Sequence, residues 1–126
     1  MLSNTLFNDV TYDLVGLATR GLVTVGRSSR SRMLLESPTI PSMLSRKHAQ
    51  FLFQPDANII LRDMGSTNGT YASRHGVDLR KLGELEQWVL MEGDLIAFGG
   101  PRNVIANDIS IANPFVFVYS NLYTYR

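Results

Sequence analysis

Short apolar runs recur along the whole chain, and each one ends at glycine, proline, asparagine, aspartate or another polar residue. Runs of this length, rich in branched and aromatic side chains and bounded by turn residues, predict β-strands. Because little of the chain has a helical period, the pattern predicts an all-β sandwich of two antiparallel or mixed sheets. The predicted strands cover residues 22–25, 49–53, 59–61, 89–91, 95–98 and 115–119.

The segments between these runs have less regular patterns. Residues 54–58 are rich in turn formers and predict a hairpin connection. Residues 78–88 fit a short helix, although Gly83 interrupts it. A first strand is expected near residues 6–7, and residues 99–103 are expected to form a loop.

Three polar clusters stand at predicted strand ends, where a loop can hold functional side chains on a rigid support. Residues 65–70 read Gly-Ser-Thr-Asn-Gly-Thr, residues 26–27 read Gly-Arg, and residues 45–48 read Ser-Arg-Lys-His. An Asn-Gly pair is typical of a type I′ hairpin turn, because both central residues of that turn have a positive φ. Taken alone, residues 65–70 therefore predict a hairpin between two strands.

The composition is that of an ordinary folded domain. The chain has 126 residues, 44% of them hydrophobic and 18% charged, which predicts a single domain over residues 1–126. It contains no cysteine, which excludes disulfides, thiolate catalysis and cysteine-ligated zinc. Its apolar runs are short and its first residues lack the pattern of a signal peptide, so neither a membrane span nor a membrane partner is predicted.

Positive charge is concentrated in one segment, although the net charge is only +1. Residues 20–47 carry six basic side chains and one acidic one, whereas residues 1–19 and residues 48–126 each have a net charge of −2. If residues 20–47 form loops at one end of a sandwich, they create a local site for an anion on an otherwise acidic body.

In their order along the chain, the three polar clusters resemble the signature of the forkhead-associated domain, a β-sandwich that binds phosphothreonine. The resemblance extends to residues 93–99, Gly-Asp-Leu-Ile-Ala-Phe-Gly. It implies a module that binds phosphothreonine-containing proteins, recruits them in signalling and catalyses nothing, with its ligand loops at one end of the sandwich. It also implies a short strand at residues 33–35.

The chemistry of a phosphate ligand agrees with these residue types. A phosphothreonine carries about −1.5 to −2 charges and three strong acceptor oxygens, and a guanidinium can donate two parallel hydrogen bonds to it. The resemblance assigns the phosphate contacts to Arg27, Ser45, Arg46 and Thr67.

The resemblance gives other residues a place around the phosphate. Asn68 is expected to bind the peptide backbone, and Arg74 and His75 to contact the side chain about three positions after the phosphothreonine. After Thr70 the chain departs from the family pattern, because residues 72–76 replace a second Asn-Gly pair. The resemblance therefore does not determine which loop residues set the peptide specificity. The residues expected to shape the site without touching the ligand are Gly26, His48 and Gly69.

Other classes of function are weighed against this one. A structural or dimerisation module with weak or no phosphate binding is the main alternative, and an exposed apolar face including Tyr119, Tyr123 and Tyr125 would favour it. Nucleic-acid binding is disfavoured, because the arginines of residues 20–47 lack interleaved aromatic residues and the rest of the chain is acidic.

An enzyme is not expected. The chain has no P-loop, no Gly-x-Ser-x-Gly elbow and no spacing typical of metal ligands, so no catalytic residue, metal site or cofactor is predicted. The expected location is nuclear or cytoplasmic, and only the resemblance favours the nucleus.

Overall fold

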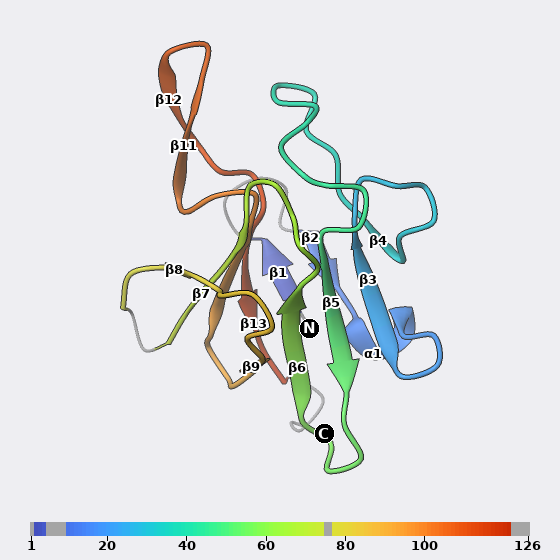
Figure 1. The fold of residues 1–126 in the computed structure, drawn as a ribbon. Coiled ribbons are helices and arrows are strands. Elements are labelled where there is room, and N and C mark those ends of the chain that lie inside the picture. The colour runs from blue at the N-terminus through green and yellow to red at the C-terminus, as the bar shows by residue number, and fades with distance from the viewer. Residues whose placement is uncertain (1, 5–9, 75–76, 122–126) are drawn as a thin grey trace.

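The computed structural model describes residues 2–4, 10–74 and 77–121, and β-strands dominate these residues (Figure 1). They form two sheets and a separate two-stranded hairpin. Antiparallel pairs predominate, and β3 and β4 form a parallel pair, so the predicted β-sandwich with antiparallel and mixed sheets is confirmed. Among the described residues, no helix is long and apolar enough to cross a membrane.

One sheet has five strands and carries most of the predicted apolar runs. Its strand order is β4-β3-β5-β6-β9. As the sequence predicts, β5 and β6 form a hairpin through residues 54–58. The bounds are Met33–Leu34 for β4, Leu22–Gly26 for β3, Ala49–Phe53 for β5, Ile59–Asp63 for β6 and Trp88–Val89 for β9.

The second sheet has six strands in the order β2-β1-β13-β10-β7-β8, and all its neighbouring strands pair antiparallel. It brings residues near the start of the chain beside residues near its end. The bounds are Val10–Tyr12 for β2, Leu2–Asn4 for β1, Val116–Tyr119 for β13, Leu95–Phe98 for β10, Thr70–Ser73 for β7 and Arg80–Lys81 for β8.

Aromatic rings fill the space between the sheets. Phe98 of β10 lies edge-on to Phe51 of β5, with ring centroids 6.3 Å apart, and its centroid is 5.9 Å from that of Phe117 of β13. All three rings are buried. Because side chains alternate between the two faces of a strand, every second residue of these strands enters this core.

Residues 65–70 do not form a hairpin, although their Asn-Gly pair predicts one. β6 belongs to the five-stranded sheet and β7 to the six-stranded sheet, so this segment crosses from one sheet to the other. Only its glycines, Gly65 and Gly69, have a positive φ, and Asn68 does not. The prediction was wrong because tertiary contacts with other loops, described below, set the conformation here.

The short helix predicted over residues 78–88 is also absent. Arg80 pairs with Ala72 of β7, and Trp88 pairs with Leu61 of β6, so this segment closes an edge of each sheet. The helix that does form, α1 at Leu14–Leu17, begins where the Asp13 carboxylate accepts a hydrogen bond from the backbone amide of Val15. The strand expected near residues 6–7 lies outside the described residues.

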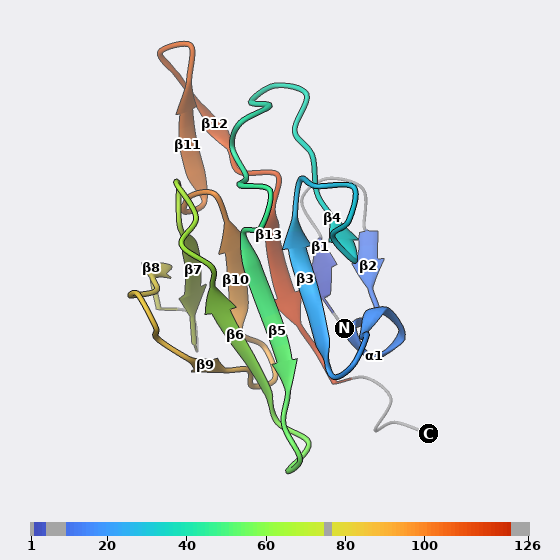
Figure 2. The same ribbon diagram turned by 45° about the vertical axis from the view of Figure 1, so that its right-hand side comes forward.

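A hairpin that sequence reasoning missed projects from one end of the sandwich (Figure 2). Its strands are β11, Asn103–Ala106, and β12, Ile109–Ala112. Its turn residues Asn107 and Asp108 both have a positive φ, of 52° and 61°, as a type I′ turn requires. The buried Asn113 anchors the hairpin, because its side-chain amide donates to the carbonyl oxygens of Gly100 and Pro101 and its Oδ1 accepts from the Phe115 amide.

Candidate functional site

Three loops meet at the end of the sandwich from which the hairpin projects (Figures 1 and 2). They are the β3–β4 loop, residues 27–32, the β4–β5 loop, residues 35–48, and the β6–β7 loop, residues 64–69. These loops hold the three polar clusters of the sequence. The fold therefore brings together residues that are far apart along the chain.

Gly26 lets the β3 end lie directly against the β4–β5 loop. A Cβ atom at this position would lie 2.0 Å from the carbonyl oxygen of Arg46 and 2.9 Å from that of Ser45. No side chain fits in so short a distance, and both neighbouring atoms belong to backbone. Glycine is therefore required here by close packing, since its φ does not lie in the left-handed region.

Arg27 follows at once and is fixed by two hydrogen bonds to the same loop. Its backbone amide donates to the Ser45 carbonyl oxygen at 3.2 Å, and its Nε donates to the Leu44 carbonyl oxygen at 2.7 Å. The side chain is exposed, and among the described residues no hydrogen bond occupies its terminal nitrogens, Nη1 and Nη2. The guanidinium is thus oriented by one nitrogen and keeps two parallel donors for an anion.

Ser45 joins the β4–β5 loop to the β6–β7 loop. Its Oγ accepts a hydrogen bond from the Thr67 amide at 3.0 Å, and its own amide donates to Nδ1 of His48 at 3.1 Å. With one lone pair of the hydroxyl engaged, the hydroxyl hydrogen remains a donor for a ligand. Ser45 is half-buried and Thr67 is exposed, so both stand at the surface of this end.

His48 is a buried linker between loops. Its Nε2 donates to the Gly69 carbonyl oxygen at 2.7 Å, and its Nδ1 accepts from the Ser45 amide, so the ring is neutral with its proton on Nε2. Burial lowers the pKa of His48, and this effect exceeds the opposite effects of the Gly69 hydrogen bond and the nearby Asp63 carboxylate. The ring is fully buried and lies edge-on to Phe98, so it supports the loops from beneath.

The conformation of the β6–β7 loop depends on Asp63, a residue that sequence reasoning missed. Its carboxylate accepts hydrogen bonds from the amides of Gly65 and Ser66 and from the hydroxyls of Ser66 and Thr70. Burial acts to raise the pKa of Asp63, but these hydrogen bonds together lower it below its usual value. The available signal was an aspartate two residues before a glycine, which is typical of an Asx turn.

Two more contacts fix the β6–β7 loop against its neighbours. The side-chain amide of Asn68 donates to the Met43 carbonyl oxygen at 3.0 Å. The Gly69 carbonyl oxygen accepts from the amide of Gly99 at 2.9 Å as well as from His48. Asn68 is nevertheless exposed, and its amide group also carries an acceptor oxygen.

Arg46 adds positive charge beside Ser45. Its side chain is exposed, and its carbonyl oxygen accepts from the Ser31 hydroxyl at 3.3 Å. Arg30 and Lys47 line a hollow nearby on the same loops. Part of the positive charge of residues 20–47 therefore lies on the loops at this end, and Glu36 lines the same cleft as Arg27.

Arg74 does not lie with these residues. It follows the far end of β7, which starts at Thr70 beside the loops and pairs with β10 along its whole length. Arg74 forms a bidentate ion pair with the fully buried Asp94, at 3.0 and 3.1 Å, and stacks over the Trp88 ring at 4.6 Å from its centroid. These contacts favour a structural role for Arg74 over the expected role in peptide specificity, which stays a prediction to be tested by mutation. His75 lies outside the described residues.

Comparison with known proteins agrees with this geometry. The family model of the FHA domain matches residues 23–99, which is more than half of the chain. No curated protein sequence matches the chain.

Several solved structures share the fold. One is the N-terminal FHA domain of Saccharomyces cerevisiae Rad53p in complex with a phosphothreonine peptide, with 25% identity, a TM-score of 0.56, and coverage of 94% of this chain and 87% of that chain. Another is the FHA domain of Chlamydia trachomatis CT664 protein, with 19% identity, a TM-score of 0.56, and coverage of 82% and 80%.

A third is Mycobacterium tuberculosis EmbR in complex with a low affinity phosphopeptide, with 19% identity and a TM-score of 0.52. The match covers 79% of this chain but spans only about a fifth, 20%, of the EmbR chain. The matched residues 23–99 include all three polar clusters described above. The chain therefore belongs to the family of forkhead-associated (FHA) domains.

Proposed function

We propose that this chain is a non-catalytic module that binds phosphothreonine-containing segments of other proteins and so recruits phosphorylated partners in signalling. One observation carries the proposal. The Arg27 guanidinium is held in place through Nε by the Leu44 carbonyl oxygen, while its two terminal nitrogens stand at the surface among the loop ends.

Each neighbouring residue has a role in the proposed contact. Arg27 donates two hydrogen bonds to phosphate oxygens, and the Ser45 hydroxyl donates a third. Arg46 contributes charge and Thr67 a hydroxyl, and Asn68 holds the peptide backbone through its amide oxygen. A phosphothreonine has three acceptor oxygens and about −1.5 to −2 charges, whereas a carboxylate has two oxygens and one charge, so this set of donors matches the phosphate better.

Preorganisation supports this assignment. The loops are already joined by hydrogen bonds between Ser45 and Thr67, between Asn68 and Met43, and between His48 and Gly69. A ligand that binds loops already ordered loses less conformational entropy on binding. The site therefore fits a reader that needs no large rearrangement.

The environment of His48 supports binding without catalysis. Both ring nitrogens are engaged in hydrogen bonds within the protein, and the ring is fully buried. A general base must reach the proton that it removes, and His48 cannot reach a ligand on the surface. The proposed location stays nuclear or cytoplasmic, and only the family resemblance favours the nucleus.

One observation expected to favour a structural or dimerisation module is absent from the structure. Tyr119 was expected on an exposed apolar face, but it is 8% exposed and belongs to the core. Tyr123 and Tyr125 lie outside the described residues. Tyr119 therefore gives this alternative no support, and the phosphothreonine module is the single function proposed.

Binding of fluorescein-labelled peptides, measured by fluorescence anisotropy, tests the proposal. The probe is a degenerate library with a fixed phosphothreonine, compared with the same library carrying phosphoserine or unmodified threonine. Arg27→Ala should weaken binding by roughly tenfold or more, because a charged hydrogen-bonded contact is lost. Arg20→Ala is the matched control, since Arg20 is an exposed arginine at the opposite end of β3.

Binding that does not require the phosphate would contradict the proposal. Equal affinities for native chain and Arg27→Ala would contradict it as well.

A further inference from the structure

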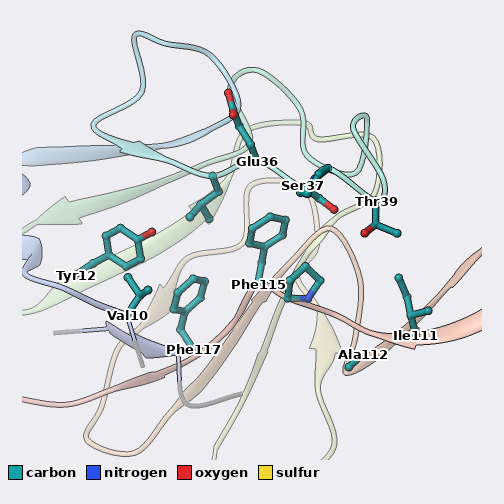
Figure 3. Close-up of a pocket in the computed structure, with 12 residues that line it drawn as sticks. Val10, Tyr12, Glu36, Ser37, Thr39, Ile111, Ala112, Phe115 and Phe117 are labelled. Carbon is teal, nitrogen blue, oxygen red and sulfur yellow. The ribbon is translucent and has the colours of Figure 1, made fainter. Parts of the chain in front are cut away.

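An apolar groove of about 610 Å³ lies beside the proposed phosphate site (Figure 3). One wall is the start of the β4–β5 loop, residues 35–39, and the other is the base of the hairpin at Ile111 and Ala112. The rings of Phe115 and Phe117 lie between these walls. A concave apolar surface of this kind is typical of a binding site.

The hairpin extends this apolar surface outward. In the β11–β12 register Val104 pairs with Ile111, and Ala106 pairs with Ile109, so these four apolar side chains share one face. Val104 packs against the core, but Ile109 is 63% exposed. Ile105 on the other face is also exposed, but only the Ile109 face continues the apolar lining of the groove. An isolated two-stranded hairpin is only marginally stable in water, so this face points to contact with a partner.

The groove and the phosphate site form one continuous surface. Three residues, Glu36, Ser37 and Pro38, line both the groove and the cleft that contains Arg27. An extended peptide advances by roughly 3.3 Å per residue. A peptide held at Arg27 therefore enters the groove within a few residues of its phosphothreonine.

We infer that the groove binds an extended apolar segment of the same phosphorylated protein whose phosphothreonine contacts Arg27. This inference rests on the proposed function. The ligand chemistry is a phosphothreonine followed or preceded, a few residues away, by apolar side chains that lie on Phe115 and Ile111. Glu36 is exposed on the wall shared by the two sites, and it favours a basic residue between the phosphothreonine and the apolar segment.

The experiment uses fluorescein-labelled 15-residue peptides with phosphothreonine at the centre and serine and alanine elsewhere. A Leu-x-Leu pair is moved through the flanking positions, and dissociation constants are measured for each peptide. When the pair stands at one or two neighbouring positions on one side of the phosphothreonine, the dissociation constant should fall by roughly tenfold relative to the serine-alanine reference peptide. Partial burial of two leucine side chains accounts for a change of this size.

Two isoleucines of the same hairpin provide matched variants. Ile111→Ser should remove most of the gain from the Leu-x-Leu pair and leave the affinity for the reference peptide unchanged. Ile105→Ser should keep the gain, because Ile105 pairs with Ser110 on the other face and is 71% exposed. Thr39→Gln, in the opposite wall, narrows the groove without changing the hairpin and should also reduce the gain.

The outcomes separate this inference from the proposed function. If no placement of the apolar pair improves binding, or if Ile111→Ser and Thr39→Gln leave the improvement intact, the groove is not a peptide site. If no phosphopeptide binds at all, the proposed function itself fails. Analytical sedimentation of the native chain and of Ile111→Ser tests for a dimer. If the native chain is a dimer and Ile111→Ser is a monomer, the groove binds a second copy of this chain, and the inference is wrong.

Discussion

The Ser45 hydroxyl oxygen accepts a hydrogen bond from the Thr67 backbone amide at 3.0 Å, although the two residues are 22 positions apart in the sequence. Together with the Asn68–Met43 and His48–Gly69 hydrogen bonds, this contact joins the β4–β5 loop to the β6–β7 loop. It also fixes the position of the serine oxygen, so that the remaining hydroxyl hydrogen is available where the loops meet.

Ser45→Ala should therefore weaken phosphothreonine-peptide binding by about tenfold, because the variant loses a donor to the phosphate and loosens the Thr67 loop. Stability should change by less than about 1 kcal/mol, since the Thr67 amide is close to solvent. Peptide titration and urea denaturation measure the two effects. Ser28→Ala is the control, because among the described residues the Ser28 hydroxyl binds within its own loop, to the Arg30 amide. An unchanged affinity in Ser45→Ala would remove Ser45 from the site.

Gly26→Ala should destabilise the protein by about 3 kcal/mol or more, since a Cβ 2.0 Å from the Arg46 carbonyl oxygen forces the end of β3 away from the β4–β5 loop. Gly65→Ala is the matched control. Gly65 has a positive φ of 79°, but a Cβ atom added there would meet no other part of the protein within 4 Å, so only backbone strain of about 1 kcal/mol is expected. Guanidinium denaturation measures both, and equal losses would contradict the packing argument.

Asp63→Asn should lower the free energy of unfolding by about 2 kcal/mol, because an amide oxygen replaces a carboxylate that accepts four hydrogen bonds in the β6–β7 loop. Peptide affinity should fall as well, since the loop carries Thr67 and Asn68. The control is Asp56→Asn, in an exposed turn where Asn58 is the hydrogen-bond partner of the carboxylate among the described residues. A stable Asp63→Asn variant with an intact affinity would show that the loop is held by other contacts.

Arg74→Ala should cost about 1 to 2 kcal/mol of stability and leave phosphopeptide affinity unchanged. The variant leaves the fully buried Asp94 carboxylate with Trp88 and Met91 as its remaining hydrogen-bond donors. The cost is moderate because the Arg74 side chain is 32% exposed. Denaturation and peptide titration are the two measurements. A selective loss of affinity for peptides varied three residues after the phosphothreonine would restore Arg74 to the peptide site.

Stability should fall as the pH is lowered below about 6.5. The pKa of His48 is lower in the folded protein than in the unfolded chain, so below the unfolded value the unfolded chain binds a proton that the folded protein does not. This contribution is fully present above pH 6.5 and is lost as the pH falls toward the folded pKa. The lowered pKa of Asp63 adds a further loss as the pH falls below its ordinary value of 3.8.

Denaturation midpoints between pH 8 and pH 5 measure the contribution of His48. The chain has only two histidines, so His75→Gln is the control and should keep the slope. A pH-independent midpoint in this range would contradict the buried neutral state of His48.

The sequence predicted the elements that local pattern controls. The apolar runs at β3, β5, β6 and β10 are continuous and bounded by turn residues, and these strands form close to the predicted bounds. The ordered polar clusters led to the family, and the family model matches residues 23–99. The positions of Arg27 and Ser45 at strand ends also followed from the pattern, although their contacts with a ligand stay a prediction.

Other features could not be read locally. Asn68 and Gly69 have the composition of a hairpin turn, yet they cross between sheets, because Met43, His48 and Gly99 hold them through hydrogen bonds from distant segments. Residues 78–88 alternate too weakly to show that they pair with β6 and β7. The contact between Arg74 and Asp94 could not be predicted either, because the pairing of β7 with β10 brings the two residues together.

By itself the sequence determined an all-β family, the strands of its core and the residue types of an anion site, because alternation, turn chemistry and charge are local properties. The tertiary structure decided which of these residues meet. Arg27, Ser45 and Thr67 lie together at one end of the sandwich, and the base of an apolar hairpin lies beside them. Arg74 lies away from these loops, beyond the far end of β7, where it contacts Asp94. The reason is physical: these contacts join segments far apart in the chain, and their geometry exists only after both sheets have packed.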